Sequence, residues 1–202
     1  VLTRILARDG AQISATTAAR RAVDPAARLH AATEMLYDAL GAAAENRLGA
    51  SARNRLDALA DSIIPALSEC QAWPVLRRNL SVLALSGANP HDLLTAALAL
   101  GGVDDATDPA AVLDHRIDPA GTHSAGIGVF GWVPDIPAAL RDDPQWGAYL
   151  ARREQLVESL ADDVRERAHG WTKTTAPAWA LPLIAGDATL TAEVAVFRAV
   201  VG

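Results

Sequence analysis

The stretch WPVLRRNLSVLALS, residues Trp73 to Ser86, predicts the centre of the protein's core. Its apolar side chains recur every three or four residues, which is the spacing of one helix face. Pro74 suits the first turn of a helix, where its missing N–H would have no intrahelical partner. We therefore expect a helix here that is buried on most sides. Its apolar residues are Leu76, Leu80 and Leu83, flanked by Val75, Val82 and Leu85.

On both sides of this stretch, the chain repeats one helix-start signal, an Asp or Asn followed by Pro. The side-chain oxygen of such a residue accepts a hydrogen bond from a free backbone N–H group of the first turn. The signal occurs at Asp24-Pro25, Asn89-Pro90, Asp108-Pro109 and Asp143-Pro144. Together with the apolar spacing, it predicts four helices. These run from Asp24 to Gly49, from Pro90 to about Leu100, from Pro109 to Ile117 and from Pro144 to about His169.

Two further helices and one irregular segment complete the prediction. We expect Ser51 to cap a second helix, so that residues 23–70 form a helical hairpin. A last helix is expected from about Ala188 to Val200, in a C-terminal helical domain that spans 71–202. Residues 118–137 are rich in Gly and Pro, so we expect a strap that Trp132 fixes to the core. Strand patterns are poor, and the sequence predicts an all-α, irregular multi-helix bundle.

The composition excludes several classes of protein. Of the 202 residues, 50% are apolar, which is enough to bury a sizeable core. No uninterrupted apolar run reaches the roughly 18 to 20 residues that a membrane span requires, so no span is expected. The single cysteine, Cys70, cannot form an internal disulfide and favours a cytoplasmic location. The net charge of −6 argues against a role as the main electrostatic grip on nucleic acid.

Most motifs of catalytic or cofactor-binding sites are absent from the sequence, and the one that is present lacks the secondary structure it requires. Gly126, Gly128 and Gly131 match the glycine pattern of dinucleotide-binding folds, but Pro134 follows where a helix would have to begin. The five histidines are scattered without the spacing of metal ligands, and the sequence has no phosphate-binding loop with its lysine. We therefore predict no catalytic residue, no cofactor and no metal site in this segment.

Five tryptophans and three arginine pairs remain as candidates for binding. Aromatic rings beside arginines can stack on single-stranded bases. Alternatively, the tryptophans fix loops onto a core of Ala and Leu. The charged face of the helix predicted from Pro144, which includes Arg152 and Arg153, would then be a solvated surface. The candidate contacts with DNA or with a protein partner are Trp73, Arg77, Arg78, Arg152 and Arg153.

Several segments carry a resemblance to a known family through their order along the chain. They are RDGA (8–11) with SATT (14–17), WPVLRR (73–78), DPAAVL (108–113), WVP (132–134) with Ile136-Pro137, DPQWGAYL (143–150) and AEVAVFRA (192–199). In this order they resemble the region C-terminal to the helicase core in actinobacterial MobF-type (TrwC/TraA-like) conjugative relaxase-helicases. Each segment is a packing motif, and the resemblance spans nearly the whole chain. Phe197 departs from the family, in which Trp is expected at that position.

The resemblance implies a parent protein that nicks DNA at a transfer origin, unwinds it and travels with the strand into a recipient cell. Residues 1–22 would then be a linker that follows the upstream helicase core. No catalytic residue of the family falls on this chain, so the segment would be a non-catalytic accessory module. Its partner would be the upstream helicase domain or a protein of the conjugation machinery. Handling of single-stranded DNA through Trp73, Arg77 and Arg78 is one alternative, and a structural spacer is another.

Overall fold

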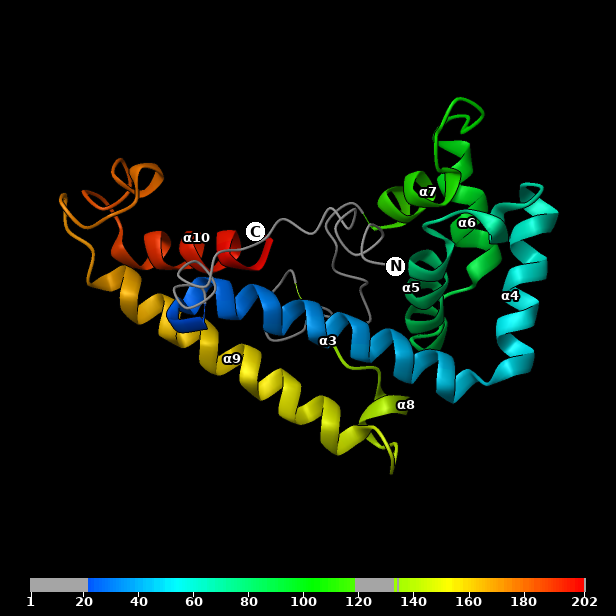
Figure 1. Ribbon diagram of the computed structural model, residues 1–202, viewed down its shortest axis with the longest axis horizontal. Coiled ribbons are helices and arrows are strands. Elements are labelled where there is room, and N and C mark those ends of the chain that lie inside the picture. The colour runs from blue at the N-terminus through cyan, green and yellow to red at the C-terminus, as the bar shows by residue number, and fades with distance from the viewer. Residues whose placement is uncertain (1–21, 119–132, 134, 202) are drawn as a thin grey trace, which may run out of the picture. The chain divides into compact units, whose positions relative to one another are not determined.

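The computed structural model describes residues 22–118, 133 and 135–201, and within these ranges it contains helices and no strands. This result confirms the all-α prediction. Most of the predicted strap and nearly all of the predicted linker lie outside the described residues. The helices, labelled in Figure 1, are α3 (Pro25–Leu48), α4 (Ala50–Ile63), η1 (Leu67–Glu69), α5 (Trp73–Leu85), α6 (Pro90–Ala99), α7 (Pro109–Ile117), α8 (Ala138–Arg141), α9 (Gly147–His169), η2 (Ala178–Ala180) and α10 (Ala188–Val201).

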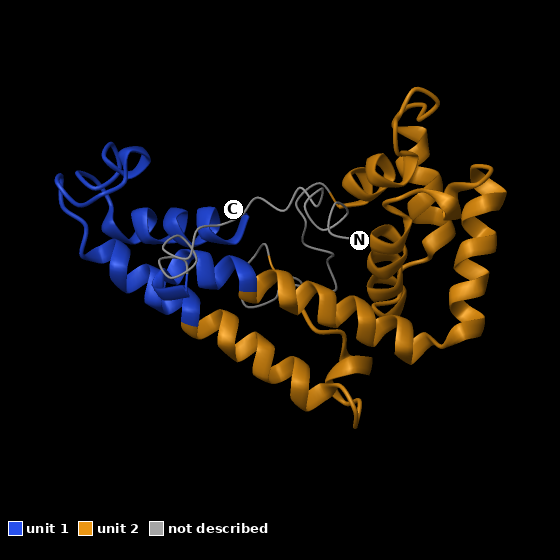
Figure 2. Cartoon of the chain, in the orientation of Figure 1, with its two compact units in different colours: residues 1–31, 160–202 blue, residues 32–159 orange. Residues whose placement is uncertain are grey.

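The chain divides into two compact units, which Figure 2 shows in different colours. The first unit consists of residues 1–31 and 160–202, and the second of residues 32–159. The long helices α3 and α9 each contribute residues to both units. None of the helices in the described ranges combines the length and the apolarity needed to cross a membrane.

The core of the second unit is built around α5, as the sequence predicted. Trp73, Leu76 and Leu80 of this helix are at most 2% exposed. The side chains packed with them come from α4, η1, α6, α7 and the segment before α7, and burial of such apolar side chains is the main stabilising contribution to folding. The boundary predicted between the hairpin (23–70) and the C-terminal domain (71–202) falls inside this cluster, because residues from both sides of it pack together. The members are Leu56, Ala60, Leu67, Trp73, Leu76, Leu80, Leu94, Ala97, Val103, Ala110 and Leu113.

Two of the Asp/Asn-Pro signals, at Asn89 and Asp108, form the expected capping bonds. The Asn89 side chain accepts a hydrogen bond from the His91 backbone N–H at 3.1 Å, and Asp108 accepts one from Ala111 N–H at 3.1 Å. Asp108 also accepts a bond from the Ala72 N–H group at 2.8 Å. One carboxylate therefore caps α7 and ties its start to the start of α5.

Two helix starts differ from the predictions. Helix α4 begins at Ala50, with Gly49 at the capping position in a left-handed conformation (φ 80°), so Ser51 lies inside the helix and does not cap it. Glycine suits this φ because it has no Cβ. Helix α9 begins at Gly147, because residues 144–146 form a turn after Asp143. Figure 1 also shows α4 turning away from the end of α3, and α4 packs on η1, α5 and α6.

In the first unit, α10 buries a face of small and β-branched side chains. Its buried residues are Thr191, Ala192, Ala195, Val196, Ala199 and Val200. Its end is fixed by a bond of 3.0 Å between Nδ1 of His30 and the Val200 carbonyl. Arg165 of α9 donates from Nε to Oε1 of Glu193 at 2.7 Å. These contacts hold the start of α3, the end of α9 and α10 together within this unit.

Candidate interaction surfaces

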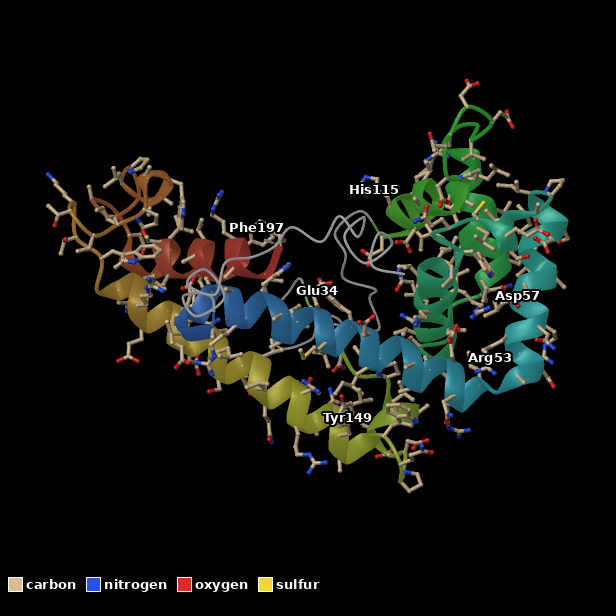
Figure 3. All side chains as sticks on the ribbon, in the orientation of Figure 1. Glu34, Arg53, Asp57, His115, Tyr149 and Phe197 are labelled. Atoms are coloured by element: carbon tan, nitrogen blue, oxygen red, sulfur yellow. The ribbon has the colours of Figure 1, made fainter. Side chains whose placement is uncertain are left out.

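Two of the five predicted contact residues serve the interior of the second unit. Trp73 is 2% exposed, and its indole Nε1 donates a hydrogen bond to Oδ1 of Asp57 at 2.8 Å. Arg77 donates from Nε to Oε1 of Glu45 at 2.8 Å and from Nη1 to Oδ1 of Asp57 at 3.1 Å. Figure 3 labels Asp57 on α4, beside α5. The indole N–H of Trp73 and the Nε and Nη1 groups of Arg77 are thus already bonded to carboxylates within the protein.

The environment of Arg77 also fixes its charge. Burial lowers the pKa of the guanidinium, but the hydrogen bonds to Glu45 and Asp57 outweigh this effect and raise the pKa above its ordinary value. The positive charge of this partly buried guanidinium is already balanced by two carboxylates within the protein, so a phosphate would gain less from it than from an unpaired arginine. The structure therefore favours an internal role for Trp73 and Arg77 over contact with DNA.

Arg78 lies at the contact between α3 and α5. Its Nη1 is 3.3 Å from Oδ1 of Asp38, and the Arg78 side chain is 41% exposed. A Cβ atom on Gly41 of α3 would lie 2.8 Å from the Cβ of Arg78, closer than such atoms approach. The absence of a side chain at Gly41 therefore allows the two helices to come this close.

Arg152 and Arg153 are adjacent in the sequence but lie in different surroundings. Arg152 is exposed on α9. The guanidinium of Arg153 lies over the ring of Tyr149, 5.2 Å from its centroid, and Nε donates to the Tyr149 hydroxyl at 3.1 Å. Its Nη1 is 3.2 Å from Sδ of Met35 on α3. The cation–π contact and these polar contacts hold Arg153 in one orientation.

A groove of about 620 Å³ opens beside Arg153 in the second unit, and we call it the α3–α9 groove. Ala39 and Ala42 contribute its small side chains, while Trp146 and Tyr149 contribute aromatic ones. Figure 3 labels Tyr149 in the first turns of α9. Met35 is 52% exposed at the edge of the groove, so an apolar surface is open to solvent. The remaining lining residues are Asp38, Gln145 and Arg153.

Local contacts orient the aromatic side chains of the α3–α9 groove. The Asp143 carboxylate accepts hydrogen bonds from the backbone N–H groups of Gln145 and Trp146 at 2.9 and 3.0 Å, which fixes the turn before α9. The rings of Trp146 and Tyr149 meet edge to face, with centroids 6.2 Å apart and planes at 71°. Such edge-to-face packing is a favourable arrangement of aromatic rings. Tyr149 in turn supports Arg153, so the groove presents an ordered surface.

A second pocket, of about 400 Å³, lies in the first unit, and we call it the tryptophan pocket. Trp171 and Trp179 meet edge to face there, with centroids 5.5 Å apart and planes at 82°. The guanidinium of Arg198 lies over the Trp179 ring, 5.1 Å from its centroid. Arg198 is 19 residues from Trp179 in the sequence, and as part of α10 it comes beside this ring only in the folded chain.

The described residues contain no group of three or more His, Cys, Asp or Glu side chains placed to hold a metal ion. Of the predicted contact residues, Arg153 alone lines one of these two pockets. The sequence did not single out Met35 or Tyr149 as contact residues, and it indicated Trp146 only as one of five tryptophans that could bind or could pack in the core. Comparisons of the chain with protein-family models, with curated proteins and with solved structures found no match.

Proposed function

We propose that this segment is a non-catalytic docking module of a conjugative relaxase-helicase, and that it binds the helicase core or a protein of the transfer machinery through the α3–α9 groove. The observation that carries the proposal is the apolar lining of this groove, formed by the exposed Met35 and the half-buried, edge-to-face rings of Trp146 and Tyr149. Trp, Tyr, Met and Arg, which all line this groove, are enriched in protein–protein interfaces. The resemblance to relaxase-helicases supports the choice of parent protein, and the single cysteine supports a cytoplasmic location.

The groove favours a partner segment with an apolar side chain that reaches Ala39 and Ala42. Small residues leave room for such an anchor, and the aromatic rings supply contact area with few rotatable bonds. Arg153 has its Nε bonded to Tyr149, while its guanidinium lines the groove and can meet a carboxylate next to the anchor. An amphipathic helix with one apolar stripe fits these requirements.

Handling of single-stranded DNA by Trp73, Arg77 and Arg78 is less well supported. The first two side chains are engaged with Asp57 and Glu45, and the net charge of −6 opposes a polyanion.

Titration calorimetry with the purified helicase core and the coupling protein of the same transfer system tests the proposal. Met35→Glu places a charge at the edge of the groove and should weaken binding by about tenfold or more, since a buried unpaired charge costs at least about 1.4 kcal/mol. Val75→Glu is the matched control, because Val75 is an exposed apolar residue of similar exposure, 51% against 52%, on α5. Equal weakening by the two variants, or no binding of the wild-type segment to either protein, would contradict the proposal.

A further inference from the structure

The tryptophan pocket combines an apolar surface with an arginine that has a defined orientation. Ala195 and Ala199 of α10 and Val164 of α9 line it with small side chains, and the two indoles lie at nearly a right angle to each other. A guanidinium that stacks on an aromatic face keeps its N–H groups at its edge, where they can bond a carboxylate in a two-pronged geometry. The guanidinium carbon of Arg198 lies over the Trp179 ring, 5.1 Å from its centroid.

The two arginines that line the pocket differ in their ion pairs. Arg167, the other arginine of the pocket, forms an ion pair with the Asp24 carboxylate at the pocket edge. Within the described ranges, no carboxylate lies within ion-pair distance of Arg198. Arg198 is exposed and belongs to the pocket lining, so a ligand can reach it without breaking an existing ion pair. The pocket therefore has one apolar side and one cation without an anionic partner among the described side chains.

We propose that the tryptophan pocket binds a short acidic peptide segment of a partner protein, with an aromatic or aliphatic side chain against the indoles and an adjacent carboxylate on Arg198. The site is separate from the α3–α9 groove and does not depend on the docking function proposed for that groove. The interaction with Arg198 is electrostatic, so we expect binding to weaken as salt screens the charges.

The neighbouring charges favour a short acidic peptide over a strand of nucleic acid. A strand carries a phosphate at every nucleotide and requires cations along its path. On α9, the exposed residues Asp162, Asp163 and Glu166 lie within the five residues before Arg167, and their negative charges oppose the approach of such a strand. A peptide with one or two carboxylates can place them on Arg198 alone.

Intrinsic tryptophan fluorescence of the full segment provides the assay, with three probes. The first is a peptide with one phenylalanine flanked by glutamates, the second is the same peptide with glutamines, and the third is a single-stranded oligothymidylate. We expect saturable binding of the glutamate peptide that weakens with salt. The glutamine peptide should bind about tenfold more weakly or worse, which corresponds to at least about 1.4 kcal/mol. Tighter binding of the oligothymidylate than of the glutamate peptide would overturn the proposal in favour of nucleic acid.

Two arginine variants locate the binding site. Arg198→Gln should weaken binding of the glutamate peptide by about tenfold or more, since it removes the charge and the two-pronged donor. Arg55→Gln removes the same charge from an exposed position on α4 and should leave the affinity unchanged. Unchanged helical circular dichroism in both variants shows that the fold is kept. Equal affinities of the two variants, or no binding of the glutamate peptide to the wild-type segment, would overturn the proposal.

Discussion

The indole of Trp73 donates its single N–H to the carboxylate of Asp57, so a buried tryptophan of α5 is tied to α4 by a bond of 2.8 Å. The same carboxylate accepts a bond from Arg77. Trp73 and Arg77, which the sequence indicated as candidate DNA contacts, therefore form contacts within the protein. These contacts also make Asp57 a residue whose loss should affect folding.

Asp57→Ala should lower the free energy of unfolding by about 1 to 3 kcal/mol, because it leaves the buried Trp73 N–H without its acceptor. Asp38→Ala removes a carboxylate from the exposed ion pair with Arg78 and should cost about 0 to 1 kcal/mol. Urea denaturation followed by circular dichroism measures both values. If the two variants are equally stable, the Trp73–Asp57 contact does not have the role that we assign to it.

Gly41→Ala should destabilise the protein, although alanine is ordinarily the better residue inside a helix by about 1 kcal/mol. The added Cβ would lie 2.8 Å from the Cβ of Arg78, so α3 and α5 must move apart, at a cost of about 1 to 3 kcal/mol. The double variant Gly41→Ala with Arg78→Gly removes the opposing Cβ and should be more stable than the sum of the single effects. A gain in stability from Gly41→Ala alone would show that the contact is not tight.

Ionisation of Tyr37 should make the protein less stable at high pH. Burial, and then the charges of Asp118 and Glu34, raise the pKa of Tyr37 from 10.0 to about 12. The unfolded state ionises at a lower pH than the folded state, so ionisation of Tyr37 favours unfolding. The stability of the fold is therefore unaffected by Tyr37 below pH 10 and falls as the pH rises towards about 12. The chain has two tyrosines, so the absorbance of tyrosinate in a Tyr149→Phe variant reports Tyr37 alone. A midpoint near 10 would contradict the assignment.

Asp187→Ala should destabilise α10 through loss of its cap. The carboxylate accepts hydrogen bonds from the backbone N–H groups of Thr189 and Leu190 at 2.8 and 3.1 Å. Removal of such a cap costs about 1 kcal/mol, whereas Asp187→Asn keeps the acceptor and should cost much less. Thermal unfolding of both variants tests this prediction. Equal losses would mean that the charge of Asp187, and not its capping bond, matters.

The sequence predicted those parts of the fold that depend on local contacts. Asn89 and Asp108 cap helices because the acceptor and its N–H partner lie within three residues of each other. The burial of α5 followed from its own apolar spacing. The prediction placed the start of α9 too early. Asp143 accepts hydrogen bonds from the backbone of a turn as it would from the first turn of a helix, so an Asp-Pro pattern does not distinguish a turn from a helix start.

The candidate surfaces could not be predicted in the same way, because each depends on residues far apart in the chain. Met35 and Arg153 meet across 118 residues, and the arginine beside Trp179 comes from another element, α10. Conversely, Trp73 and Arg77 matched a binding motif locally, while their partners Asp57 and Glu45 lie 16 to 32 residues away. Composition and spacing indicate which residues could bind, but tertiary packing decides which of them remain accessible.

The most direct test of the central claim is site-specific photo-cross-linking from the α3–α9 groove. A benzophenone amino acid replaces Met35 in one sample and Val75 in another, and each segment is mixed with the purified helicase core and coupling protein. We predict that position 35 gives a covalent product with one of these proteins, that unlabelled wild-type segment suppresses it, and that position 75 gives none. No product at position 35, or equal products at both positions, would contradict the account.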